Sequence, residues 1–352
     1  MDDIINQIIR QLLGAIDDSY DKTEGYLVYD ILKSAAIALA DLQVKQNETK
    51  AQLDVNNLTG EMLEKFVFQR KGIKRNQASF AIGDLKVTGN GTVTKGDLFE
   101  TKSGIQFAAV ETKMISSTGT VGVKCVTLGS IGNVPANQIT MMPVTIPSIT
   151  NVTNPAPTHD GYDAESDDSL RDRYFIAIQT PATSGNIYHY LQWAKEITGV
   201  GDAKVFPLAR GDNTVEVVII DQSKQPASET LVGQVQTHID PNSEGLGNGE
   251  APIGAKCYVI SAAGLQIDLS LNVQAAEGYT NDEIIMNIKA AVSTYLQQIA
   301  FQMDYVSYAK IGEAILNSKG IEDYSNLKVN GGTTNVEIDS KQVAVVGGVT
   351  LV

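Results

Sequence analysis

Cysteine, histidine and tryptophan are scarce in this chain. Its 352 residues include two cysteines, three histidines and one tryptophan. Cys125 and Cys257 lie far apart and outside any C-x-x-C pattern, so they form no disulfide framework and suit a reducing compartment. His159, His189 and His238 show no metal-ligand spacing, so we expect them on the surface or in packing. We predict no metal site and no cofactor.

Long apolar runs and an excess of basic residues are also absent. No run approaches the roughly 18 apolar residues that a membrane span needs. The first 18 residues have no basic leader and no apolar core of a signal peptide. The net charge is −14, whereas a nucleic-acid binder typically carries a clustered basic face. We expect a protein without a membrane span or nucleic-acid partner, made and folded in the cytoplasm.

The length and the residue patterns predict an α+β protein of several domains. A hydrophobic content of 43% and a charged content of 19% are ordinary for a globular protein with buried cores. Helical periodicity gives way to strands and turns and then to mixed patterns. The expected parts are an N-terminal helical region (1–75), an all-β domain (76–158) and two tandem α/β modules (159–261 and 262–352).

The first 75 residues predict three amphipathic helices. Thr59 is placed to cap the third helix and Gly72 to end it. Two interpretations of the apolar stripes stay open: the helices pack on one another or on the downstream domains, or they form a bundle shared with another subunit. In the second case the expected contacts are Ile4, Ile8, Leu12, Ile31, Ala35, Leu39 and Leu42.

The β-domain is predicted from short apolar runs separated by turn residues. Gly89-Asn90-Gly91 is expected to be one of the breaks between strands. The segment Ile149–Thr158, with its Asn-Pro and Ala-Pro steps, is interpreted as an extended linker. The expected strands are Phe80–Thr88, Thr92–Thr94, Gln106–Val110, Val121–Leu128 and Gln138–Met142.

The stretch from Gly161 to Asp221 predicts a compact α/β unit. Ser166 is a good helix cap, and the negative charges of the aspartates after it are stabilised by the positive end of the helix dipole. The acidic run lacks the Gly-centred spacing of a Ca²⁺ loop, so capping explains it better. A second helix is expected from near Thr183 or Ser184. A strand over Thr214–Ile220 is apolar on both faces, so both sides are expected to be covered.

The last section repeats this plan. The segments Trp193–Val205 and Ala314–Val329 each contain a helix end, a glycine, a β-branched residue, an aspartate two positions on, and a strand. Tandem modules of this kind are more typical of interaction scaffolds than of enzymes.

Two patterns could be mistaken for catalytic motifs. The glycines Gly245, Gly247 and Gly249 follow a helix and precede a strand, which is the reverse of a dinucleotide-binding loop. Ser307 and Lys310 have S-x-x-K spacing, but the motifs that accompany it in acyl-transfer enzymes are missing. We therefore predict no catalytic residues and no enzymatic activity.

An ordered set of motifs after about Leu58 resembles the baseplate J-like family of contractile phage tails and phage-tail-like bacteriocins. The resemblance is strongest at Gly161–Tyr174, in the motif residues Gly161, Glu165, Ser166, Leu170, Arg171 and Arg173. Other matching blocks are Gly60, Leu63, Gly72 and Arg75, then Gly96–Phe99, Ser103–Phe107, Gly129–Ala136, Trp193-Ala194 and Gly199-Val200. The first 57 residues match only in helical character.

The resemblance implies a structural role in the baseplate wedge of a contractile tail. Members of the family look like wedge components in which two J-like chains join a smaller protein through an N-terminal helical bundle. Their C-terminal modules contact neighbouring wedges around the hub, next to the sheath. The particle baseplate is then the expected location. The alternative is a tail-associated cell-wall hydrolase or receptor-binding adhesin, which 6% aromatic content and a single tryptophan support poorly.

Overall fold

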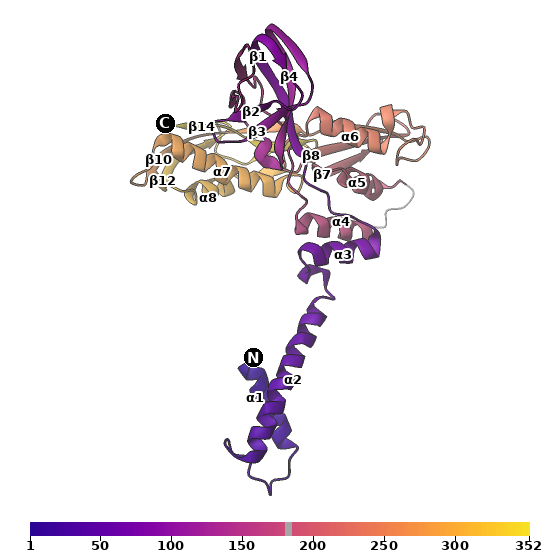
Figure 1. Ribbon diagram of the computed structural model, residues 1–352, viewed down its shortest axis with the longest axis vertical. Coiled ribbons are helices and arrows are strands. Elements are labelled where there is room, and N and C mark those ends of the chain that lie inside the picture. Colours follow the sequence, from indigo (N-terminus) through magenta and orange to yellow (C-terminus); the bar gives the residue numbers. More distant parts are fainter. Residues whose placement is uncertain (180–184) are drawn as a thin grey trace. The chain divides into compact units, whose positions relative to one another are not determined.

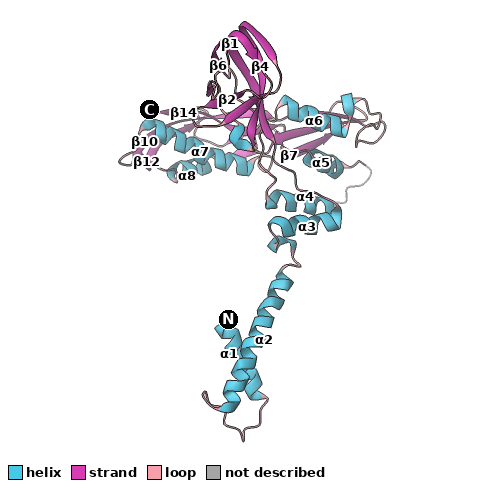
Figure 2. Cartoon of the chain, in the orientation of Figure 1, coloured by secondary structure: helices cyan, strands magenta, loops and turns pink. Residues whose placement is uncertain are grey.

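The computed structural model describes residues 1–179 and 185–352 of the chain (Figure 1). These residues divide into two compact units, Met1–Lys74 with Asp167–Arg171 and Arg75–Ser166 with Asp172–Val352. Helices make up the first unit, whereas strands and helices both occur in the second (Figure 2). This distribution confirms the predicted α+β multidomain class. The four predicted domains are a finer division than these two units and stay predictions.

The first unit begins with an α-hairpin. Ile8 and Ile9 of the first helix pack against Ala36 and Ala40 of the second, and these small alanines let the two helices approach closely. The helices of this unit are α1 (Asp2–Gly14), α2 (Leu27–Ala51), the 3₁₀ turn η1 (Val55–Asn57) and α3 (Gly60–Lys71).

The C-terminal end of α3 is capped by the predicted residue, whereas the N-terminal end is capped by a residue that was not predicted. Gly72 ends the helix in the left-handed region, at φ 70°, and its N–H donates to the Phe68 carbonyl oxygen at 2.8 Å. Thr59 precedes the helix, but the cap that the structure shows comes from Asp167. Its carboxylate accepts the Gly60 N–H at 2.9 Å, which places a negative charge at the helix N-terminus.

The β-domain is a six-stranded antiparallel sheet in the order β5-β2-β3-β4-β1-β6. Its end strands contact each other, so the sheet nearly closes into a barrel. The buried side chain of Asn154 helps the closure, because it accepts the N–H groups of Gln138 and Ile139, both at 2.9 Å. The strands are β1 (Phe80–Val93), β2 (Leu98–Thr101), β3 (Gln106–Ala109), β4 (Lys113–Leu128), β5 (Ile139–Met141) and β6 (Ile149–Thr153).

Two predictions about this domain are wrong. β1 runs without a break through Gly89-Asn90-Gly91, paired with β4 over its whole length. A Cβ on Gly89 would lie 2.2 Å from the Ser148 carbonyl oxygen, so glycine is required there by close passage of the chain before β6. The predicted linker over Ile149–Thr158 begins with β6, which pairs with β1.

The first α/β module is built on a three-stranded sheet in the order β7-β8-β9. The central strand is buried on both faces, as predicted, and its Val217 and Ile219 pack under α5 and α6. The predicted helix start near Thr183 or Ser184 lies outside the described residues. The described helix α5 follows Asn186, whose side chain caps it. The elements are α4 (Asp167–Gln179), α5 (Ile187–Glu196), β7 (Val200–Pro207), β8 (Thr214–Asp221), α6 (Glu229–Ile239), η3 (Pro241–Ser243) and β9 (Lys256–Ser261).

The second module also has a three-stranded sheet, in the order β12-β10-β14. Thr280 and Glu283 form a capping box at the start of its longest helix. The elements are β10 (Ala263–Ala275), α7 (Asn281–Ile299), β11 (Tyr305–Val306), α8 (Tyr308–Leu316), β12 (Ile321–Val329), β13 (Val336–Glu337) and β14 (Gln342–Leu351).

The two modules share one sheet plan with a different chain order. In each, a central strand has one antiparallel and one parallel neighbour. The antiparallel neighbours, β7 and β12, are the strands in the two segments that repeat in the sequence. The helix and strand of that repeat come before the central strand in the first module and after it in the second. The segments are thus equivalent in position, although their order differs.

Candidate functional site

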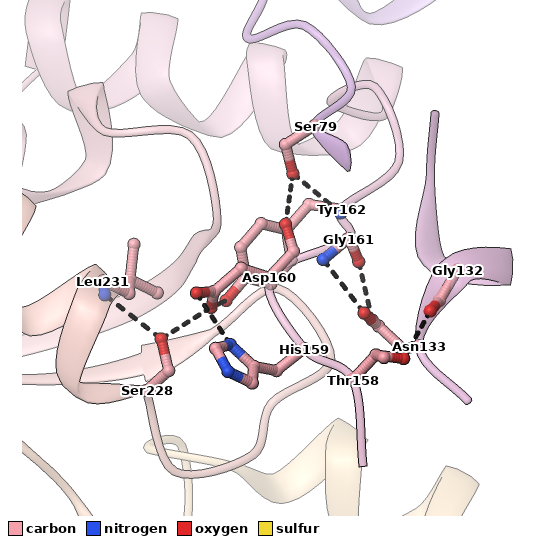
Figure 3. Close-up of polar contacts among 10 residues, drawn as sticks. All are labelled: Ser79, Gly132, Asn133, Thr158, His159, Asp160, Gly161, Tyr162, Ser228 and Leu231. Atoms are coloured by element: carbon pink, nitrogen blue, oxygen red, sulfur yellow. Dashed lines mark hydrogen bonds and ion pairs between the residues drawn. The ribbon is translucent and has the colours of Figure 1, made fainter. Parts of the chain in front are cut away.

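The junction between the β-domain and the first module is a hydrogen-bonded segment, residues 158–163. Thr158 is buried, and its hydroxyl group donates to the Gly132 carbonyl oxygen at 2.6 Å. The Asn133 amide clamps Gly161: it accepts the glycine N–H at 3.0 Å and donates to the carbonyl oxygen at 2.7 Å (Figure 3). A Cβ on Gly161 would lie 2.6 Å from the Gly129 carbonyl oxygen, so only glycine fits there.

Asp160, in the junction segment, contacts both the chain before β1 and the chain before α6. Its carboxylate accepts the hydroxyl groups of Ser228 at 2.6 Å and Tyr162 at 3.1 Å, and it lies 2.9 Å from His159 Nδ1 (Figure 3). Its carbonyl oxygen accepts the hydroxyl group of Ser79, just before β1. Ser228 in turn caps α6 by accepting the Leu231 N–H at 3.1 Å. Asp160 therefore connects the start of the β-domain to the start of α6.

A second carboxylate, Asp221, lies at the end of β8 in this region. Burial is the main cause that raises its pKa to about 6, and the negative charge of Asp160 adds to the rise. Hydrogen bonds from the N–H groups of Gln225, at 2.7 Å, and Ser223 favour the charged form but do not outweigh burial. The ionised side chain is thus less stable in the folded protein than in the unfolded chain.

Replacing Asp221 with Asn is expected to stabilise the protein at neutral pH. The rise in the pKa from 3.8 to about 6 means that the unfolding free energy falls as the pH rises from about 4 to 6, and stays low above that range. The Asp221→Asn variant would lack this fall in the unfolding free energy. The fall amounts to ~2–3 kcal/mol, because each unit of pKa difference corresponds to about 1.4 kcal/mol. Urea unfolding between pH 4 and pH 8 measures it, and an unchanged pH slope would contradict the prediction.

Glu165 and Arg173 of the family motif form a buried ion pair. The guanidinium Nη1 lies 2.8 Å from Glu165 Oε2, and the two side chains are 9% and 4% exposed for Arg173 and Glu165. The same carboxylate accepts the Asn76 N–H at 2.9 Å, and the Glu165 carbonyl oxygen accepts Arg75 Nη1 at 2.6 Å. The pair therefore anchors the chain before β1 to the chain before α4.

The remaining motif residues belong to the start of α4. Ser166 directly precedes the helix, at the predicted cap position. Leu170 is fully buried. Arg171 lies within the first unit, where it donates to the carbonyl oxygens of Val55 at 3.2 Å and Leu58 at 2.9 Å, and pairs with Asp168 at 2.6 Å. These contacts give the motif a structural role: it holds backbone segments in place around the helix start.

The α-hairpin divides the predicted partner-binding residues into two groups. Ile4, Ile8 and Leu12 of α1 pack toward α2, in the small core with Ala36 and Ala40. The other group lies on α2 and is exposed to solvent: Ile31 (59%), Ala35, Leu39 (44%) and Leu42 (61%). A groove of about 590 Å³ between the helices is lined by Ile8, Leu12, Leu39 and Leu42 with Gln11, Gln43 and Gln46.

The residues that sequence patterns raised for chemistry have structural roles. Ser307 caps α8 by accepting the Lys310 N–H at 3.3 Å, while Lys310 Nζ pairs with Glu313 at 2.7 Å. His238 Nε2 lies 3.0 Å from the Glu196 carboxylate, and the hydrogen bond that the ring donates to this carboxylate raises the pKa of His238. Within the residues that the structure describes, no three His, Cys, Asp or Glu side chains are grouped to hold a metal ion. No helix among them is long and apolar enough to cross a membrane.

Sequence reasoning missed Asp160, Asn133 and Asn154. Asn133 and Asn154 bond backbone groups 15 or more positions away in the chain, and the Asp160 carboxylate accepts the Ser228 hydroxyl group 68 positions away. No local pattern marks such partners. The one available signal was composition, because Asn and Asp tolerate positive φ and Asp160 has φ 63°. That signal predicts a turn and says nothing about what the side chain contacts.

Comparisons with known proteins agree with the motif pattern. Three domains of the baseplate J-like family match consecutive parts of the chain: the barrel domain at 84–161, the central domain at 182–261 and the C-terminal domain at 267–352. The phage-like element PBSX protein XkdT of Bacillus subtilis (strain 168) is 30% identical over 352 residues, covering 100% of this chain and 98% of that protein.

Two further similarities are more distant. Baseplate protein gp47 of Escherichia phage Mu is 27% identical over 267 residues, which is 72% of each chain. A chain in the anti-feeding prophage baseplate structure aligns over 97% of both chains, at 10% identity and a TM-score of 0.38. The family predicted from the motifs is confirmed: the chain belongs to the baseplate J-like protein family.

Proposed function

We propose that this chain is a structural component of the baseplate wedge of a contractile tail, in a phage or a phage-tail-like particle. It assembles around the hub and couples baseplate rearrangement to sheath contraction. Membership of the baseplate J-like family supports a baseplate role, and the name of the phage Mu relative supports it too. The contacts at the family motif are structural, which agrees with a scaffold that performs no reaction.

The single observation that carries the assembly role is the open apolar stripe on α2. α1 covers the face of α2 that bears Ala36 and Ala40. A different face bears Ile31, Ala35 and Leu42, at spacings of four and seven residues that place them in one line along the helix. A soluble chain rarely leaves such a line exposed unless a partner covers it.

The partners we propose for this stripe are a second copy of the chain and a smaller wedge protein. Bundled helices bury apolar stripes of this kind against one another. The groove beside Leu39 and Leu42 would receive part of the partner helix. The α/β modules would then contact neighbouring wedges, the hub and the sheath, and the protein would be located in the particle baseplate.

Replacing Ile31 with Asp is expected to abolish the hetero-oligomer without unfolding the chain. Ile31 is 59% exposed, so the change should alter the unfolding free energy by less than about 0.5 kcal/mol. A charge in an apolar helix interface should weaken association by at least about tenfold. Co-expression with the adjacent small tail protein, followed by size-exclusion chromatography with light scattering, measures the loss.

The matched control is Asn47→Asp, which adds the same charge at an exposed polar position of the same helix. It should leave the hetero-oligomer intact. If the wild-type chain stays monomeric with the partner present, and deletion of residues 1–57 changes nothing, the shared bundle is the wrong interpretation.

A further inference from the structure

One face of the β7-β8-β9 sheet carries cations stacked on aromatic rings. Val217 and Ile219 of β8 point toward α5 and α6, so Glu216 points to the opposite face. Phe206 of β7 and Tyr258 of β9 are its cross-strand neighbours and share that face. Arg210 lies over the Tyr258 ring, at 4.2 Å from its centroid, and Lys341 lies over the Phe206 ring at 5.3 Å.

Glu216 forms ion pairs with both cations. Its side chain is 5% exposed, and its two oxygens take one cation each: Oε2 lies 2.9 Å from Arg210 Nε, and Oε1 lies 2.5 Å from Lys341 Nζ. Burial opposes ionisation, but hydrogen bonds from Lys341 and Arg210 outweigh it and lower the pKa of Glu216. Lys341 precedes β14, so Glu216 also joins the two modules.

The two cations retain capacity for a further anion. Arg210 and Lys341 side chains are 43% and 42% exposed, and together they carry one charge more than Glu216 neutralises. Arg210 uses only Nε toward Glu216, and its Nη1 and Nη2 atoms donate to no acceptor among the described residues. The Arg210 guanidinium is held in place by its Nε hydrogen bond and by stacking on the ring. Its two terminal nitrogens, Nη1 and Nη2, form a fork that can bind both oxygens of a carboxylate.

The backbone at Arg210 is also held in place. Its N–H donates to the Thr214 hydroxyl oxygen at 3.1 Å, and that hydroxyl donates to the Gly211 carbonyl oxygen at 2.6 Å. The hydroxyl oxygen of Thr214 thus fixes the turn between β7 and β8. Lys341 is fixed similarly, since its N–H donates to Asp339 Oδ1 at 3.1 Å. Little conformational entropy remains to be lost when an anion binds.

We propose that Arg210 and Lys341, oriented by Glu216, form a docking site for an exposed Asp or Glu on a neighbouring protein subunit. Charge complementarity identifies this partner: the chain has a net charge of −14, so a cationic site on it is distinctive, and neighbouring copies offer many carboxylates. The inference rests on the proposed baseplate role for the presence of neighbours. The site itself is testable on the purified chain.

In solution the probe is a fluorescein-labelled oligoglutamate peptide, and the measurement is fluorescence anisotropy at low salt. Arg210→Lys keeps the charge and the Glu216 pair but removes the fork, so we expect about tenfold weaker binding. Arg70→Lys is the matched control, because Arg70 also stacks on an aromatic ring, 4.4 Å from the Phe66 centroid, in the other unit. Equal binding by the wild type and Arg210→Lys would overturn the proposal.

Inorganic phosphate serves as a competitor in the same measurement. If phosphate alone displaces the peptide at equal concentration of anionic groups, the site binds small anions, and docking of a protein carboxylate is overturned. Thermal unfolding of both variants confirms that each is folded. The expected result is that phosphate competes much more weakly than unlabelled oligoglutamate.

In assembled particles, a carbodiimide couples amines to carboxylates that already form an ion pair. We expect a Lys341 cross-link to an Asp or Glu of another chain, and we expect a lower yield of it in Arg210→Lys particles, in parallel with the weaker peptide binding. Particles in which Lys341 couples only to Glu216 of its own chain would overturn the docking site and leave the baseplate role standing. Absence of the chain from intact baseplates would instead overturn the proposed function. The peptide measurement does not depend on that function, because it uses the purified chain.

Discussion

Replacing Arg173 with Met is expected to lower the unfolding free energy by about 3–5 kcal/mol. The change removes the Arg173 guanidinium, which lies 2.8 Å from the buried Glu165 carboxylate in the wild type. The carboxylate cannot move toward water easily, because it also accepts the Asn76 N–H. Removing one partner of a buried ion pair is strongly destabilising. Replacing both partners with apolar residues is often neutral, so the large loss comes from the charge that stays buried. Guanidinium unfolding followed by circular dichroism measures the loss.

Two variants make this test specific. Lys310→Met removes a cation from an exposed pair whose side chains are 60% and 56% exposed, so the same kind of change should cost far less than Arg173→Met. The double variant Glu165→Gln with Arg173→Met should recover part of the loss, since neither side chain of the pair then carries a charge. A loss below about 1 kcal/mol for Arg173→Met would show that Glu165 finds water or another donor when Arg173 is absent.

Replacing Leu170 with Asp is expected to destabilise the first unit by about 4 kcal/mol or more. Leu170 is fully buried at the start of α4. The variant loses the buried side chain, for which truncation of leucine alone costs about 2–5 kcal/mol, and it buries a carboxylate. Thermal unfolding together with hydrogen exchange of α3 and α4 would show the loss where it arises.

The control for this position is Ile178→Asp on the same helix. Ile178 is 41% exposed, so the same kind of substitution should change the unfolding free energy by less than about 1 kcal/mol. If Leu170→Asp and Ile178→Asp have equal effects, burial of Leu170 does not hold α4 in place, and the motif leucine needs another explanation.

Elements with a local cause were predictable from the sequence. Ser228 caps α6 because a serine before an apolar-periodic run satisfies a free N–H without help from the rest of the fold. Gly72 ends α3 because glycine takes positive φ at no cost. The alternation of apolar and polar residues in β10 is typical of a strand, because the side-chain period of two is a property of the extended backbone itself.

Elements with a distant cause were not predictable. Gly89 and Gly91 were interpreted as a turn, which is the commonest local reason for paired glycines. Their actual role is to admit the backbone before β6, where Cβ atoms would lie 2.2 Å from the Ser148 and 2.3 Å from the Pro147 carbonyl oxygens. Asn154 was interpreted as part of a linker, yet its buried amide helps to close the barrel. In both cases a contact across the fold overrode the local preference.

The sequence by itself determined the family, the fold class and the position of most helices, because caps, glycine stops and apolar periods act between near neighbours in the chain. Only the tertiary structure decided which apolar faces are covered, as when α1 covers Ala36 and Ala40 and leaves Ile31 in solvent. It alone brought Arg210, Glu216 and Lys341 together, since Glu216 and Lys341 are 125 positions apart. Burial and charge pairing depend on neighbours in space, and a linear pattern does not specify them.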